Sequence, residues 1–251
     1  YRNLDDTAPP LGKLYSGHWQ KQKKKAQDSS REFARDLIKL YALRSALPGF
    51  RFSPDSPAQL EFEAGFKFVE TEDQHRAISD VKRDMEQGTA MDRLLCGDSG
   101  YGKTEVALRA ALKAVCNNYQ VAVLAPTTLL AHQHYVTFTD RFRLFPYRVS
   151  LLSRFQTSAE KKAIYPDLAS GEIGVIIGTH ALLSKTISFR NLGLIVIDEE
   201  QRFGVRQKER LKALRKTASV LTLTATPIPR TLQMALSSIK DLSIISTAPG
   251  G

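Results

Sequence analysis

Residues 92–112 read DRLLCGDSGYGKTEVALRAAL, and this stretch decides the fold. Its first five residues form a short apolar run that is typical of a buried strand. The next part matches the template G-x-x-x-x-G-K-[ST], and the apolar spacing after Lys103 predicts a helix. The order strand, glycine-rich loop, helix is the context in which backbone N–H groups and a helix N-terminus bind phosphate. The predicted phosphate loop consists of Gly97, Asp98, Ser99, Gly100, Tyr101, Gly102, Lys103 and Thr104.

Two side chains of this loop have distinct predicted roles. The Lys103 ammonium is expected to reach the β and γ phosphates of a nucleotide, and the Thr104 hydroxyl to bind Mg²⁺. The alternative is an ordinary glycine-rich turn before a helix. The strand and helix on either side favour the nucleotide, so ATP and Mg²⁺ are the predicted cofactors.

Beyond this loop, apolar runs alternate with helical patterns along the rest of the chain. The predicted strands are residues 92–96, 120–125, 148–153, 174–179, 192–198, 220–226 and 242–246. A capping box, Thr157 to Glu160, opens one of the intervening helices. Nearly continuous apolar strands that alternate with helices predict an α/β fold with a mostly parallel sheet covered on both faces. Functional loops of such a sheet lie beyond the carboxyl ends of its strands.

Acidic residues follow the strand predicted over residues 192–198. Asp198 suits Mg²⁺, and Glu199 suits a base or an orienting group for an attacking water. Acidic residues are also common in the first turn of a helix, so the pair alone does not establish a catalytic site. Together with a phosphate loop about 95 residues upstream, it predicts an NTP-hydrolysing site.

Other strand ends carry hydroxyl and small polar groups. Thr224 and Thr226 are placed to hydrogen-bond the acidic loop and to relay its state. The stretches APTTLLAHQ (125–133) and IGTHALL (177–183) offer groups that suit the phosphates of a nucleic-acid backbone. Taken singly, each of these two stretches is more typical of a helix N-cap than of a binding site.

Upstream of the phosphate loop, Phe68, Thr71 and Gln74 are spaced at three-residue intervals. An amide side chain donates and accepts together, which matches the edge of adenine, and an aromatic ring can stack on the base. As isolated residues, these three would not indicate a nucleotide-binding site.

Composition limits the class of protein. The chain has 251 residues and 42% apolar residues, which is enough for a sizeable core, and it shows neither a run of 18 apolar residues nor a signal-peptide pattern. We therefore expect no membrane partner. Cys96 and Cys116 lack metal-type spacing and are expected to be reduced thiols.

The chain is basic, with a formal net charge of +10. Residues 1–60 contain 11 Lys and Arg against 6 Asp and Glu, which accounts for half of that excess. A basic surface favours a polyanionic partner, nucleic acid first, and a solvated basic helix without a partner is the alternative. Charge alone does not separate the two.

The N-terminal part predicts a separate element. Residues 17–47 read as one long helix with a basic first half, KQKKK at 21–25, and Pro48-Gly49 ends it. The stretch SPDSP at 53–57 is interpreted as a linker. The predicted organisation is a basic helical linker segment over residues 1–52 and a nucleotide-binding lobe over residues 53–251.

In their order along the chain, these segments resemble the motifs of the first, RecA-like motor lobe of superfamily 2 helicases and translocases. The corresponding stretches are Phe68–Gln74, Gly97–Thr104, Pro126–Leu129, Gly178–His180, Asp198–Gln201 and Thr224–Pro227. The forms DEEQRFGV and TATPIPRTL are similar to those of the group that contains RecG and the bacterial transcription-repair coupling factors. MDRLLCGDSGYGKTEVALRAA and the leading LGKLYSGHWQKQKKKAQDSSREFARDLIKLYA resemble the coupling factors in particular.

The resemblance implies an ATP-driven double-stranded DNA translocase that pushes stalled RNA polymerase forward and recruits an excision-repair damage-recognition protein. Asp198 and Glu199, with Gln201, would act on metal and water, while Gln74 would read adenine. The residues implied to face the DNA backbone are Thr127, Thr128, Thr179 and His180, with Arg154 as a weaker candidate. Tyr101 and Gln201 depart from the common forms, which have Phe and His there.

The resemblance also sets expectations about the rest of the protein. Such motors hydrolyse ATP between two lobes, and the sequence is expected to be a fragment without the second lobe and with weak activity alone. The alternatives are a fragment of a RecG-type fork-remodelling helicase and a non-catalytic nucleotide-dependent DNA-binding module. Gln201 resembles members from photosynthetic lineages, so the expected location is a bacterial cytoplasm or a plastid.

Overall fold

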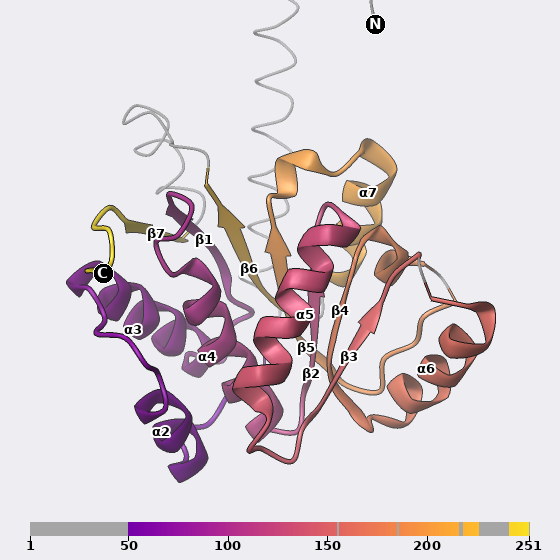
Figure 1. The fold of residues 1–251 in the computed structure, drawn as a ribbon, viewed down its shortest axis with the longest axis horizontal. Coiled ribbons are helices and arrows are strands. Elements are labelled where there is room, and N and C mark those ends of the chain that lie inside the picture. The colour runs from indigo at the N-terminus through magenta and orange to yellow at the C-terminus, as the bar shows by residue number, and fades with distance from the viewer. Residues whose placement is uncertain (1–49, 155, 185, 216–217, 226–240, 251) are drawn as a thin grey trace, which may run out of the picture. The chain divides into compact units, whose positions relative to one another are not determined.

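The computed structural model describes residues 50–250 except 155, 185, 216–217 and 226–240. The predicted helix over residues 17–47 lies outside these residues. The described part forms a sheet of seven parallel strands in the order β3-β4-β2-β5-β6-β1-β7 (Figure 1). The strands are β1 (Asp92–Gly97), β2 (Gln120–Leu124), β3 (Arg148–Leu152), β4 (Ile173–Gly178), β5 (Leu192–Asp198), β6 (Ser219–Thr224) and β7 (Asp241–Ile245). Each predicted strand is present, and the predicted α/β fold is confirmed.

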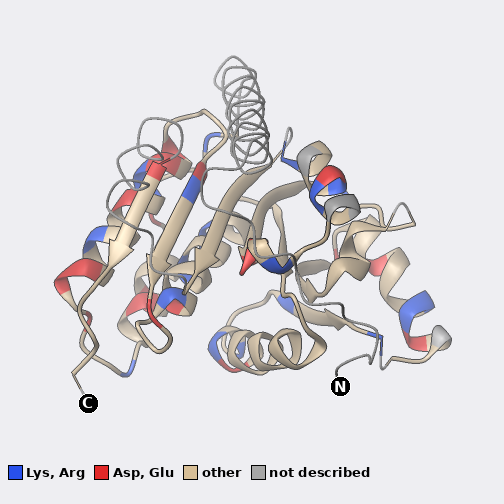
Figure 2. Ribbon diagram, turned by 90° about the horizontal axis from the view of Figure 1, so that it is seen from above, with Lys and Arg blue, Asp and Glu red and all other residues tan. Residues whose placement is uncertain are grey.

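Helices connect most of the strands. They are α2 (Pro57–Ala64), α3 (Glu72–Glu86), α4 (Lys103–Cys116), α5 (Thr128–Phe142), α6 (Ser158–Ser170) and α7 (Val205–Leu214). The capping box predicted at Thr157 is present at the start of α6. A second capping box, Thr71 with Gln74, begins α3. Figure 2 shows that the helices carry most of the charged residues and that the strands are mostly uncharged.

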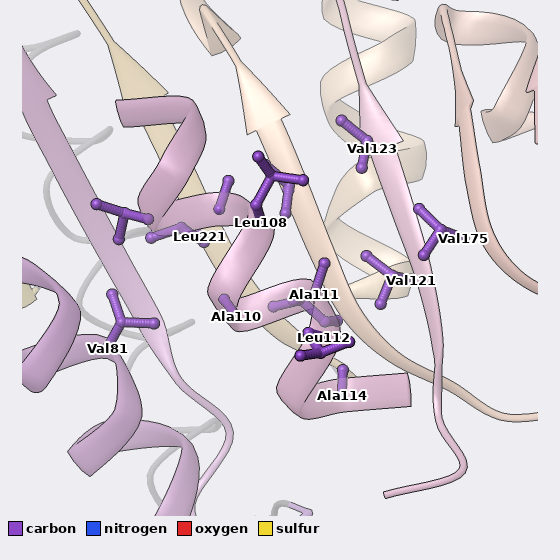
Figure 3. Close-up of a cluster of buried hydrophobic side chains, with 14 of the residues drawn as sticks. Val81, Leu108, Ala110, Ala111, Leu112, Ala114, Val121, Val123, Val175 and Leu221 are labelled. Carbon is purple, nitrogen blue, oxygen red and sulfur yellow. The ribbon is translucent and has the colours of Figure 1, made fainter. Parts of the chain in front are cut away.

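Side chains alternate between two apolar cores, one on each face of the sheet. Val121 and Val123 of β2 belong to the first core, together with buried side chains of α3 and α4 (Figure 3). This core also contains buried side chains of α2 and α5. Ala122 and Leu124 of the same strand belong to the second core, with side chains of α6 and α7. Because successive strand residues point to opposite faces, both faces of the sheet are covered, as the apolar runs predict.

The stretch interpreted as a linker is packed against the lobe. Phe52 is 1% exposed and its N–H donates to the Met85 carbonyl oxygen. Asp55 forms ion pairs with Lys82 and Lys113, and the Ser56 hydroxyl caps α2. Residues 52–56 are therefore an integral part of the lobe, and the boundary at residue 53 stays a prediction. Among the described helices, none has the length and apolar character that crossing a bilayer requires.

Candidate functional site

The phosphate loop lies between β1 and α4, as predicted. Gly100 and Gly102 have positive φ angles of 84° and 80°, a conformation that favours glycine. A Cβ on Gly102 would lie 2.3 Å from the Gln74 Nε2 atom, so any side chain at this position would displace the Gln74 amide. The loop is thereby curled at the N-terminus of a 14-residue helix, where backbone N–H groups and the helix dipole favour an anion.

Lys103 lies inside this loop. Its ammonium donates to the carbonyl oxygens of Gly97 and Asp98, at 2.6 and 2.8 Å. Burial lowers the pKa of Lys103, while the negative charges of Asp198, Glu199 and Asp98 oppose that shift. The structure thus brings the predicted phosphate-binding lysine into the electrostatic field of both predicted acidic residues, which stand about 95 positions away in the sequence.

Gln74 performs a structural task in the described lobe. Its Oε1 accepts from the Thr71 N–H at 3.0 Å, and its Nε2 donates to the Tyr101 carbonyl oxygen at 3.0 Å. Gln74 is 4% exposed, so it connects the start of α3 to the phosphate loop from a buried position. The contact with adenine stays a prediction. Phe68 is 68% exposed, and its ring centroid lies 5.6 Å from that of Phe66. Stacking of this ring on a base stays a prediction.

The acidic residues occupy the end of β5. Asp198 is the last residue of the strand, and Glu199 follows with φ 51°, in the left-handed region that non-glycine residues rarely adopt. The Glu199 N–H donates to the Leu223 carbonyl oxygen at 2.9 Å. Its carboxylate accepts from the Ala225 N–H at 2.6 Å. Strained backbone of this kind is concentrated at functional sites, and here two hydrogen bonds to the neighbouring β6 segment hold it.

Side chains complete the contact between these two strand ends. The Thr224 hydroxyl lies 3.5 Å from the Glu199 carboxylate, and the Gln201 amide donates to the same carboxylate. Gln201 also lies 3.5 Å from the Thr224 hydroxyl. The predicted contact of Thr224 with the acidic loop is therefore present, whereas Thr226 lies outside the described residues. Whether these groups relay a signal stays a prediction.

The predicted DNA-contacting residues gather around one pocket of about 350 Å³. Its lining consists of Pro126, Thr127, Thr128, Ser153, Arg154, Lys161, Thr179, His180 and Ala181. Thr127 also caps α5 by accepting from the Leu130 N–H. The capping interpretation is therefore confirmed for this residue, and the contact with DNA stays a prediction. All five predicted residues are thus brought together from the ends of β2, β3 and β4.

Sequence reasoning missed two residues of these sites. Lys161, in the first turn of α6, adds a second cationic side chain to the pocket beside Arg154. His134, in α5, places its Nε2 atom 2.9 Å from the Asp198 Oδ2 atom. Neither residue belongs to a recognisable motif, although His134 directly follows the 125–133 stretch in the sequence.

The residues of the loop and the acidic segment fit a nucleotide with Mg²⁺. Thr104 stands in the first turn of α4 and Asp198 at the end of β5. Across the described residues, no three or more His, Cys, Asp or Glu side chains group as a complete metal site. One hydroxyl and one carboxylate match the way Mg²⁺ binds, through few protein ligands together with substrate phosphates and water.

Comparisons with known proteins agree with this geometry. The sequence model of the DEAD/DEAH box helicase family matches residues 71–235. The chain is similar to transcription-repair-coupling factors of Bacillus subtilis and Haemophilus influenzae, with 52% and 54% identity over 249 residues, or 99% of the chain. It spans about a fifth of their length, 21% and 22%. A solved structure of RecG bound to a three-way DNA junction is also similar, with 34% identity and a TM-score of 0.71. That match covers 86% of this chain and 30% of the RecG chain.

Proposed function

The chain belongs to the DEAD/DEAH box helicase family, and from this premise we propose that it is the ATP-binding lobe of a double-stranded DNA translocase. The nucleotide binds at Gly97–Thr104, with Lys103 on the β and γ phosphates. Bound Mg²⁺ supplies charge neutralisation at the phosphates, and Thr104 and Asp198 are the residues that hold it. Glu199 orients the attacking water, supported by Gln201 and Thr224.

One observation carries this proposal. In the sheet order, the ends of β5, β6 and β1 are neighbours, and the ends of β3, β4 and β2 are neighbours. The first three carry the acidic loop, Thr224 and the phosphate loop; the second three carry the pocket that contains Thr127, Arg154 and Thr179. A nucleotide site and a pocket with two cationic side chains therefore share one edge of the sheet, an arrangement that supports a DNA-stimulated ATPase.

The further activity of the whole protein is part of the same proposal. The identity with the coupling factors, 52–54% over 99% of the chain, exceeds the 34% identity with RecG over 86%. This difference favours a translocase that displaces stalled RNA polymerase and couples transcription to excision repair over a fork-remodelling helicase. RNA polymerase and the damage-recognition protein would bind regions outside these residues, in a bacterial cytoplasm or a plastid.

Calorimetry of nucleotide binding tests the proposal. Lys103→Ala removes the charge on the β and γ phosphates and should weaken ATP binding, whereas Glu199→Gln should preserve binding and abolish DNA-stimulated turnover in the full-length protein. Lys162→Ala, on the exposed face of α6, is the control and should leave both measurements unchanged. Equal ATP affinity for the wild type and Lys103→Ala would contradict the assignment.

A further inference from the structure

His134 occupies the boundary between the two halves of this sheet edge. It lies in α5, the helix that follows β2, and its imidazole contacts the carboxylate of Asp198 at the end of β5. β2 and β5 are adjacent strands. The end of β2 belongs to the pocket half of the sheet edge, and the end of β5 belongs to the nucleotide half. The contact therefore bridges the two candidate sites.

The bridge is short and well shielded. The His134 and Asp198 side chains are 11% and 13% exposed, and the Nε2–Oδ2 distance is 2.9 Å. A carboxylate oxygen accepts, so the imidazole donates through Nε2. Because this hydrogen bond engages Oδ2, it fixes the rotation of the carboxylate and leaves Oδ1 as the oxygen available for other partners.

The N-terminal end of α5 reaches the pocket. Thr127 caps the helix and Thr128 begins it, and both line the pocket with Arg154 and Lys161. His134 lies six positions after Thr128, which corresponds to about 9 Å along a helix axis. Ala131 and Phe138 of the same helix are fully buried in the first core, so α5 is anchored to the core on both sides of His134.

We propose that His134 is a positioning residue that fixes the Asp198 carboxylate for Mg²⁺–ATP and that, through α5, ties this carboxylate to nucleic acid bound at Thr127 and Thr128. The inference rests on the proposed function, because it assigns Mg²⁺ to Asp198 and nucleic acid to the pocket. Groups that hydrogen-bond a metal-ligating side chain typically change metal affinity or activity 10- to 100-fold when they are removed.

The experiment uses the full-length protein and a non-hydrolysable ATP analogue. The affinity of the analogue is measured by calorimetry in Mg²⁺ and in EDTA for the wild type, His134→Leu and His134→Gln. In Mg²⁺, His134→Leu should bind the analogue about 10- to 100-fold more weakly than the wild type does. In EDTA, its affinity for the analogue should equal that of the wild type. His134→Gln retains a donor and should restore most of the Mg²⁺-dependent gain in affinity.

The matched control is His132→Leu, an exposed histidine two positions away on the same helix, which should behave as the wild type. Thermal unfolding of each variant checks folding, and His134→Gln keeps the test meaningful if the leucine variant is unstable. An unchanged Mg²⁺-dependent gain in His134→Leu would overturn the proposal, and so would an equal loss of affinity in Mg²⁺ and in EDTA, since that result indicates a purely structural role.

A second arm tests the link through α5. In the wild type, duplex DNA should change the affinity of the analogue in Mg²⁺ by about 5- to 150-fold, the usual range of coupling between two sites. His134→Leu should remove this change while keeping its affinity for DNA without nucleotide. An intact effect of DNA in His134→Leu would overturn the link. A wild type that binds neither the analogue nor DNA would refute the proposed function itself, so the two failures are distinguishable.

Discussion

Gly102 shows how strongly single residues of the phosphate loop are determined by their surroundings. Its φ of 80° excludes most side chains, and a Cβ would in addition meet the Gln74 amide at 2.3 Å. Gln74 cannot easily move away, because its two amide atoms bond the Thr71 N–H and the Tyr101 carbonyl oxygen. Gly100 has a similar φ of 84° but nothing within 4 Å of its Cβ position.

Gly102→Ala should therefore destabilise the lobe more than Gly100→Ala. Both variants incur the left-handed conformation of an alanine, about 1–2 kcal/mol. Gly102→Ala should additionally lose the Gln74 hydrogen bonds, which contribute about 1 kcal/mol each. Urea unfolding of both variants measures the difference.

The control is the same pair of variants in a Gln74→Ala background. There the extra cost of Gly102→Ala should disappear, because the amide that the new methyl group would displace is gone. Equal destabilisation by the two glycine variants in the wild-type background would show that the Gln74 contact does not constrain the loop.

At the scale of elements, a cluster of buried charges fixes α4 to the segments around it. Arg109 of α4 is 3% exposed and forms ion pairs with Glu105, Glu63 and Glu70. Burial opposes the charge of this guanidinium, but the hydrogen bonds that it donates to Glu70 and Glu105 raise its pKa. Because Glu70 directly precedes Thr71, the cluster ties the helix of the phosphate loop to the segment that carries Phe68 and Gln74.

Arg109→Met should destabilise the lobe by about 1.5–3 kcal/mol, because it removes a buried cation that donates charged hydrogen bonds to Glu70 and Glu105. Glu105 and Glu63 keep their second cationic partners, Arg141 and Lys82. Arg83→Met is the matched control: Arg83 pairs with Asp80 at 2.6 Å, but its side chain is 60% exposed. An exposed pair contributes less than about 1 kcal/mol. Similar unfolding free energies for the two variants would mean that burial of the Arg109 cluster has no energetic consequence.

A second carboxylate fixes the chain after β7. Asp73, in the first turn of α3, accepts hydrogen bonds from the side chain and backbone N–H of both Ser246 and Thr247, at 2.7–3.1 Å. The Ser246 hydroxyl contributes most to this set, which lowers the pKa of Asp73 to about 2 from its usual 3.8. The ionised carboxylate is therefore the form that stabilises the folded state.

The sign of the pH dependence follows from this lowered pKa. The contribution of Asp73 should be fully present above its usual pKa of 3.8 and should be lost as the pH falls toward about 2. The difference in unfolding free energy between the wild type and Asp73→Ala should thus shrink when urea unfolding is repeated from about pH 6 down to about pH 3. Ser246→Ala should reduce this pH dependence, and a difference that stays constant over the range would contradict the account.

The same elements show what the sequence reveals and what it conceals. The strands were predictable because nearly continuous apolar runs such as residues 192–198 are bounded by turns, and the phosphate loop because its chemistry needs a fixed local spacing. The order of the strands was not predictable, because it depends on packing between distant segments. Likewise, the contacts Gln74–Tyr101 and His134–Asp198 span 27 and 64 positions, and no local pattern encodes such distances.

For the whole molecule, charge should determine the character of the proposed contact with DNA. The net charge is +10, and the described pocket adds Arg154 and Lys161 to the hydroxyl groups around it. Cationic side chains that neutralise phosphates release counterions, so the logarithm of affinity falls with the logarithm of salt by about 0.9 per phosphate contacted. We expect a steep salt dependence and little sequence preference for duplex DNA.

Lys161→Gln tests this expectation at the pocket. The variant should weaken binding to all duplex sequences alike and reduce the salt slope by about 1, the effect of losing one phosphate contact. Lys162→Gln removes the same charge from the next position of α6, where the side chain is exposed and outside the pocket, so it should leave the slope close to that of the wild type. Fluorescence anisotropy of a labelled duplex over a series of salt concentrations gives both slopes for the full-length protein. Identical salt slopes for Lys161→Gln and the wild type would show that Lys161 contacts no phosphate. The DNA backbone would then bind elsewhere on the protein, and not at this pocket.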